Sequence, residues 1–205
     1  MRIKDYYLKT KNFIDVNRKK IYIYSLLFTL LFSIFNRILG VVKGSIWHET
    51  ISVYYLILVI IKGILIFYIY KSIKKEKQII VYRFIKVLLV ILNTSLIIPI
   101  ILIIMNKRVV EMTLISSIVV ALYVTIKTVV TIIQFIKKRK EENILFTELR
   151  TINLMDVTVS ILTLTNTLIA VNSDDYDISM YYLTIAVCIV GFVVNIFLLT
   201  SLKEK

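Results

Sequence analysis

The sequence predicts an all-α protein, a polytopic transmembrane bundle of six helices arranged as three hairpins with both termini cytoplasmic. The chain has 205 residues, of which 59% are hydrophobic, and its mean hydropathy is +0.85. A soluble domain of this length could not bury so much apolar surface. Apolar runs of about 20 residues recur along the chain, and each is long enough to cross a hydrocarbon core as a helix. A transmembrane barrel would instead show segments of roughly ten residues with alternating polarity.

The expected helices follow from the places where apolar sequence gives way to charged sequence. They cover residues 21–42, 51–71, 84–105, 113–136, 152–172 and 179–201. A basic leader (1–20) is expected before the six-helix domain (21–201), and a short cytoplasmic tail (202–205) after it. The leader has no A-x-A cleavage site behind it, so it is not read as a signal peptide. It suits either a short helix lying on anionic lipid or a solvated basic tail.

The positive charges are unevenly divided between the two sides of the predicted bundle. Of the 26 Lys and Arg residues, twenty fall in the leader, the 71–86 linker, the 137–150 linker and the tail. Only three fall in the loops on the opposite side, and three more lie inside the spans. Because Lys and Arg collect on the cytoplasmic side of a membrane, this bias predicts a multi-pass protein of the plasma membrane with both termini inside the cell.

Aromatic residues stand near the predicted helix ends. Trp47, Tyr54 and Tyr55 lie at the outer end of the second helix. Indole and phenol rings prefer the headgroup layer, so these three residues are expected to act as interfacial anchors.

The three hairpins share features of a weak internal repeat. The second and fourth helices read "YYLILVIIKGILIFYIYKSIKKEK" and "YVTIKTVVTIIQFIKKRKEE", with "IK" at matching places. Each odd-numbered helix has an asparagine inside its apolar run, namely Asn36, Asn93 and Asn166. A triplicated hairpin would give this pattern, and so would chance in a sequence rich in Ile, Leu, Val and Lys. The three asparagines are expected to be buried and to join helices by hydrogen bonds.

Two lysines lie near the middle of predicted spans. Lys62 and Lys127 each cost about 2.5–3.5 kcal/mol to insert at a helix centre, so each needs an interior position and a partner. Asp156 is the obvious acid within a span, and Glu148 is the next candidate. Snorkelling would bring the Lys127 ammonium towards the level of Asp156, which makes this pair geometrically plausible. The lysines either form an ion or substrate pathway or fix the packing of the helices.

The fifth expected helix carries a polar stripe. Asn153, Asp156, Ser160, Thr163 and Thr167 are spaced by 3, 4, 3 and 4 residues, which keeps them on one helical face. Polar side chains that face lipid find no hydrogen-bond partners there, so this face is expected to point towards the interior of the bundle. It either supports close packing with interhelical hydrogen bonds or lines a hydrophilic path.

Catalytic and metal-binding patterns are missing from the sequence. It contains no G-x-S-x-G, H-E-x-x-H or Walker A motif, so no enzyme activity, catalytic residue or cofactor is predicted. Its single His48 and single Cys188 lie in different segments and do not make a zinc site. The net charge of +13 is explained by the membrane topology, so nucleic acid is not an expected partner.

Four stretches resemble a group of small six-helix membrane proteins of Gram-positive, clostridia-like bacteria, a group with no established activity. They are "GSIWHETISVYYLIL", "YRFIKVLLVILNTSL", "YVTIKTVVTIIQFIKKRK" and "INLMDVTVSILTLTNTLIA". The resemblance implies the fold class and a membrane location. Members of the group carry small apolar residues near position 156, so Asp156 departs from their pattern.

Two functional hypotheses follow. The first is a small permease or channel in which Lys62, Lys127 and the polar stripe face a common pathway. The second is a non-catalytic regulatory or immunity-type subunit that works by helix–helix binding and has a dry, packed interior. Expected partners are the bilayer, anionic headgroups on the cytoplasmic side, and either a second copy of the chain or another membrane protein.

Overall fold

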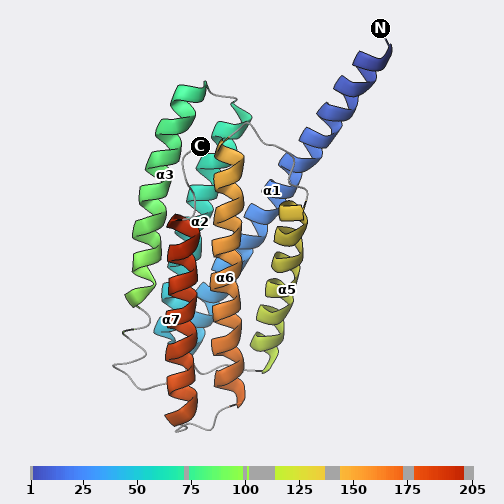
Figure 1. Ribbon diagram of the computed structural model, residues 1–205. Coiled ribbons are helices and arrows are strands. Elements are labelled where there is room, and N and C mark those ends of the chain that lie inside the picture. Colours follow the sequence, from blue (N-terminus) through green and yellow to red (C-terminus); the bar gives the residue numbers. More distant parts are fainter. Residues whose placement is uncertain are drawn as a thin grey trace.

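The computed structural model describes the backbone of residues 2–71, 74–98, 101, 114–136, 144–172 and 178–200. Within these ranges it leaves out the side chains of 2–19, 133–136, 166, 169–170, 172, 178–181, 183–184 and 198–200. The described chain is all-helical and forms one bundle (Figure 1). Its helices are α1 (Arg2–Lys43), α2 (Ile46–Tyr70), α3 (Lys75–Ser95), α5 (Leu114–Ile136), α6 (Ile144–Asn172) and α7 (Ile178–Thr200).

Within the described ranges, four segments are both long and apolar enough to cross a membrane. They are Lys20–Lys43 of α1, Ile46–Tyr70, Lys75–Ser95 and Leu114–Ile132. Their outward faces are strongly apolar, as in Leu31 on α1 and Phe67 on α2, which are 62% and 61% exposed. A surface of this kind suits a protein embedded in lipid.

The helix boundaries differ from the sequence-based expectation at several places, and the third helix, expected to reach residue 105, ends at Ser95. Helix α3 begins at Lys75 rather than at residue 84, and α6 begins at Ile144 rather than at 152. In both cases the first turns carry charged residues, which mark the edge of an apolar run without ending a helix. The boundary placed at residue 20 lies inside α1, whose first turns project away from the other helices (Figure 1).

The connection between α1 and α2 is a tight turn built on a glycine. Helix α1 ends at Lys43, and Gly44 follows with a φ of +60°, a conformation that other residues adopt at a cost. The Ser45 amide then donates to the Gly40 carbonyl over 3.1 Å, which closes the helix end in the manner of a Schellman motif. This turn lays α1 and α2 against each other.

Helix α6 is the centre of the bundle. It packs against α5 and α7, and it also contacts α2 and α3; Figure 1 shows it between α5 and α7. Helix α3 packs against α2, α6 and α7, and the described parts of α3 and α5 do not pack on each other. The division of the chain into three hairpins therefore stays a prediction.

Candidate functional site: a buried lysine–aspartate cluster

Two lysines and one aspartate from three helices meet in the middle of the bundle. The Asp156 carboxylate of α6 accepts hydrogen bonds at Oδ2 from Lys62 of α2 and from Lys127 of α5. The distance from Lys127 Nζ to Oδ2 is 2.7 Å. All three side chains are at most 2% exposed. Both mid-helix lysines therefore use the same carboxylate oxygen.

Helix α1 completes the cluster with two hydroxyl groups. Thr29 Oγ1 lies 2.9 Å from Asp156 Oδ2 and accepts hydrogen bonds from Lys62 over 3.1 Å and from Lys127 over 2.5 Å. Lys127 also donates to the Ser25 carbonyl over 3.0 Å. The single Thr29 hydroxyl hydrogen can go either to Asp156 Oδ2 or to the Ser25 carbonyl, 2.8 Å away. These contacts join α1 to α2, α5 and α6.

The second carboxylate oxygen of Asp156 faces weaker donors. The Tyr123 hydroxyl lies 3.4 Å from Oδ1, and the Ser160 hydroxyl lies 3.5 Å away. Ser160 makes a shorter bond, of 2.6 Å, to the backbone carbonyl of Asp156. The Tyr55 hydroxyl reaches Ser160 Oγ over 2.9 Å. Oδ1 is thus less strongly bonded than Oδ2.

Aromatic rings cover this side of the cluster. Phe32 stacks on Tyr123 with ring centroids 3.8 Å apart and contacts Tyr55 edge-on at 4.9 Å. The Lys127 ammonium lies 5.9 Å from the Tyr123 ring centroid, within the range of a cation–π contact. These ring contacts fix the positions of Tyr55 and Tyr123, whose hydroxyl groups lie beside the cluster.

The cluster carries a surplus of positive charge. Lys62 and Lys127 bring two ammonium groups, and Asp156 brings one carboxylate. The other polar partners of the two ammonium groups, Ser25 and Thr29, are uncharged. With every group in its ordinary ionised form, one positive charge remains uncompensated at a place where unpaired charge is costly.

The predicted polar stripe on α6 is buried along its whole length. Asn153, Asp156, Ser160, Thr163 and Thr167 are at most 1% exposed. Asn153 joins the cluster by accepting a hydrogen bond of 3.2 Å from Ser25. Thr163 and Thr167 bond instead to carbonyls one turn back in their own helix, over 2.9 and 2.6 Å. Of these five stripe residues, only the N-terminal three, from Asn153 to Ser160, contribute to the charged cluster.

Glu148, the second acid considered for Lys127, lies apart from the cluster. Its side chain is fully buried, and neither carboxyl oxygen has a hydrogen-bond partner. The charged group that acts on it electrostatically is the ammonium of Lys86 on α3. Glu148 stands eight residues before Asp156, which is about 12 Å along the axis of α6.

The three asparagines singled out for packing have different surroundings. Asn36 is fully buried, donates to the Phe32 carbonyl over 2.8 Å, and accepts from His48 Nδ1 over 3.0 Å. Asn93 is 2% exposed, and its Oδ1 has no partner. The side chain of Asn166 lies outside the described residues.

The expected interfacial anchors are mostly interior residues. Tyr54 and Tyr55 are 2% and 0% exposed, and Trp47 is 7% exposed. Tyr55 takes part in the cluster through Ser160. Their position near a helix end suggested a headgroup role, but the Tyr55 ring contacts Phe32 of α1 and Tyr54, and its hydroxyl reaches Ser160 of α6, so these rings pack inside the bundle.

Sequence reasoning missed the contribution of α1. Ser25, Thr29 and Ser33 were not identified, although together with the predicted Asn36 they are spaced by 4, 4 and 3 residues in an apolar helix, and all four are at most 4% exposed. This is the same kind of one-sided polar spacing that marked the stripe on α6. Tyr123 has no such pattern in the sequence, because its contact with Asp156 depends on how α5 packs on α6.

Comparison with known proteins does not place the chain in a family. No protein family, no curated protein and no solved structure matches the chain. Among the described residues, no group of three or more His, Cys, Asp or Glu side chains is placed to hold a metal ion. The chemistry of the site is therefore read from the cluster itself.

Proposed function

We propose that this is a small permease- or channel-like protein that moves ions or small anionic solutes through a polar pathway centred on Lys62, Lys127 and Asp156. It would be a multi-pass protein of the plasma membrane with both termini cytoplasmic, as the distribution of Lys and Arg predicts. A relation to the six-helix proteins of Gram-positive bacteria belongs to the same proposal.

The observation that carries this proposal is the surplus charge of the cluster. A purely structural ion pair would be neutral, because every unpaired charge in a bilayer raises the free energy of the folded protein. Here two ammonium groups share one carboxylate oxygen. A third participant, either an anion that joins the lysines or a proton that leaves one of them, would restore neutrality. Exchange of such a participant is the elementary step of transport.

The surroundings of the cluster supply a continuation of the pathway. Asn153 and Ser160 adjoin the charged groups, and Thr163 and Thr167 continue the polar face along α6. In the other direction along α6 lies Glu148, whose unpartnered carboxyl is a place where a proton can bind. Ionisable residues inside a membrane commonly mark such routes.

Flux measurements on the purified protein in liposomes test this function. The wild type should carry small anions or protons down an imposed gradient, and Lys127→Met should abolish the flux because it removes the surplus charge. Lys43→Met, which removes an exposed ammonium at the end of α1, is the matched control and should leave the flux intact. The absence of any ion or solute flux from the wild type would overturn the proposal.

A second function, that of a non-catalytic membrane partner, is favoured by the close packing of the site. Ser25, Thr29, Lys62, Lys127 and Asp156 are at most 4% exposed, and their polar groups bond mainly to one another. A dry, self-contained cluster suits a subunit that acts through its surface. In that case a wild type without flux would form a stable complex with a second membrane protein, and Lys127→Met would alter its stability but not that complex.

A further inference from the structure

A groove opens between α2 and α3, away from the charged cluster. It has a volume of about 580 Å³ and is lined by Gly63, Ile64, Phe67, Tyr68, Ile80, Val81 and Phe84. Nearly all of this lining is hydrocarbon or aromatic. The groove is thus suited to an apolar occupant.

Gly63 makes room for the groove. A Cβ added to Gly63 would meet no atom within 4 Å, whereas one added to Gly191 would lie 2.1 Å from the Leu162 side chain. Glycine at 191 is explained by close helix packing, but glycine at 63 is not. Its missing side chain leaves open space on a face of α2 that an apolar residue would otherwise fill.

Exposed lysines surround the end of the groove where α2 connects to α3. Lys71 follows the lining residue Phe67 by four residues, and Lys77 precedes Ile80 by three, so each is about one helical turn from the groove. Lys74 and Lys75 are exposed between them. The Lys71 ammonium lies 5.9 Å from the Phe67 ring centroid. The groove therefore has an apolar floor and a cationic end.

We propose that this groove binds one anionic phospholipid, with an acyl chain along the apolar lining and the phosphate among Lys71, Lys74, Lys75 and Lys77. A lipid of this class matches both properties of the groove at once. A hydrophobic protein helix would match the lining but would leave the lysines without a counter-charge. The inference rests on the membrane setting proposed above and does not depend on transport.

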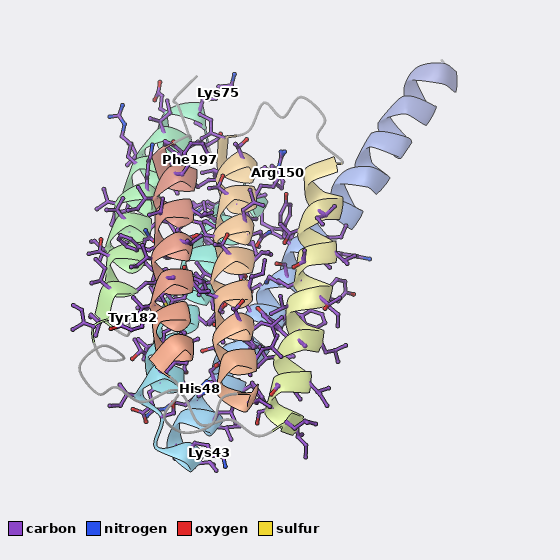
Figure 2. All side chains as sticks on the ribbon, turned by 60° about the horizontal axis from the view of Figure 1, so that its bottom comes forward. Lys43, His48, Lys75, Arg150, Tyr182 and Phe197 are labelled. Atoms are coloured by element: carbon purple, nitrogen blue, oxygen red, sulfur yellow. The ribbon has the colours of Figure 1, made fainter. Side chains whose placement is uncertain are left out.

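The position of the lysines strengthens the choice of lipid. Figure 2 shows Lys75 at the end of the bundle that also carries Arg150, with Lys43 at the opposite end. Glu76 is the one acidic residue from position 71 to position 98 of the sequence, so lysines outnumber acids in this stretch. Lysines near a membrane surface attract anionic headgroups.

Native mass spectrometry of the full chain in mild detergent tests the site, with phosphatidylglycerol and phosphatidylcholine of identical acyl chains as probes. The wild type should keep one phosphatidylglycerol in preference to phosphatidylcholine. Gly63→Phe should fill the groove and weaken the binding of both lipids about tenfold or more, a loss typical of a removed apolar contact surface. Ile60→Phe is the matched control, since Ile60 lies on α2, is 54% exposed and does not line the groove.

Substitution of the lysines distinguishes the contribution of the headgroup from that of the acyl chain. Lys71→Gln and Lys77→Gln should each reduce the preference for phosphatidylglycerol about fivefold and leave phosphatidylcholine binding unchanged. Lys43→Gln, at the opposite end, should have no effect on either lipid. If Gly63→Phe does not fold, Ile80→Trp fills the groove from the α3 side and should give the same loss.

Four results would overturn the proposal. The first is equal retention of the two lipids by the wild type, and the second is unchanged lipid binding by a folded groove-filling variant. The third is equal loss of lipid in Ile60→Phe, which would mean that the lipid covers the surface of α2 in general. Capture of a membrane protein in place of lipid would contradict it as well. A failure of ion flux would leave these outcomes untouched, so the lipid site and the transport function can fail separately.

Discussion

The buried lysine–aspartate cluster and the side of the bundle formed by α3 and α7 differ in how their polar groups are paired. Where α1, α2, α5 and α6 meet, two lysines, an aspartate and several hydroxyl groups bond to one another. Towards α3 and α7, Asn93 Oδ1 and both side-chain polar atoms of Asn195 are buried without a hydrogen-bond partner. Buried polarity is therefore a source of cohesion in the cluster and a cost at these two asparagines.

This difference is instructive because hydrophobicity alone does not separate the two sides. Both have mainly apolar cores, and both hold buried polar residues. The cohesive side has one carboxylate within reach of donors from three other helices. The effect of removing a polar residue should then depend on which side it occupies.

The largest effect is expected from Asp156→Asn. This change leaves two buried ammonium groups without a counter-charge and should lower the free energy of unfolding by about 3–5 kcal/mol. Unfolding in mixed micelles, titrated with a denaturing detergent, would measure it. A variant as stable as the wild type would mean that Asp156 does not hold the lysines, and the contrast between the two sides would disappear.

A matched pair of asparagine substitutions sharpens the comparison. Asn195 is fully buried and unpartnered, so Asn195→Leu should raise the free energy of unfolding by about 1–3 kcal/mol. Asn153 accepts from Ser25, so Asn153→Leu should lower it by a similar amount. The same unfolding titration compares the two variants. Changes of equal sign would show that both asparagines occupy equivalent environments.

The two mid-helix glycines give a smaller contrast in packing. Gly191→Ala would place a Cβ 2.1 Å from Leu162 and should cost about 1–3 kcal/mol through overpacking. Gly63→Ala meets no neighbouring atom and should leave the stability nearly unchanged. Thermal unfolding followed by circular dichroism in detergent distinguishes them. Equal losses would show that the groove beside Gly63 is closed in solution.

Much of the architecture is readable from the sequence, because lipid imposes a simple length requirement. Runs of about 20 apolar residues give the helices and most of their ends. The early starts of α3 and α6 were missed because charged turns extend a helix beyond its apolar run. Which helices pack together is not encoded in such a local pattern.

The site was partly readable for a related reason. A lysine in the middle of an apolar helix requires a partner, and Asp156 was the obvious acid within a span, so placing Lys127 beside it needed little tertiary information. Lys62 shares the same oxygen, and Thr29 bridges both lysines. Both relations depend on how α1 and α2 approach α6. These relations require a three-dimensional arrangement that spacing along one helix does not provide.

The central claim is that two lysines share one carboxylate and leave a surplus positive charge. A double-mutant cycle of Lys62→Met and Lys127→Met, read out as the free energy of unfolding in mixed micelles, tests it most directly. Each single variant leaves a neutral lysine–aspartate pair and should be as stable as the wild type or more stable. The double variant leaves the Asp156 carboxylate buried without a counter-charge and should be less stable. The expected coupling energy between the two substitutions is about 2–3 kcal/mol. Two single losses that simply add up in the double variant would contradict the claim.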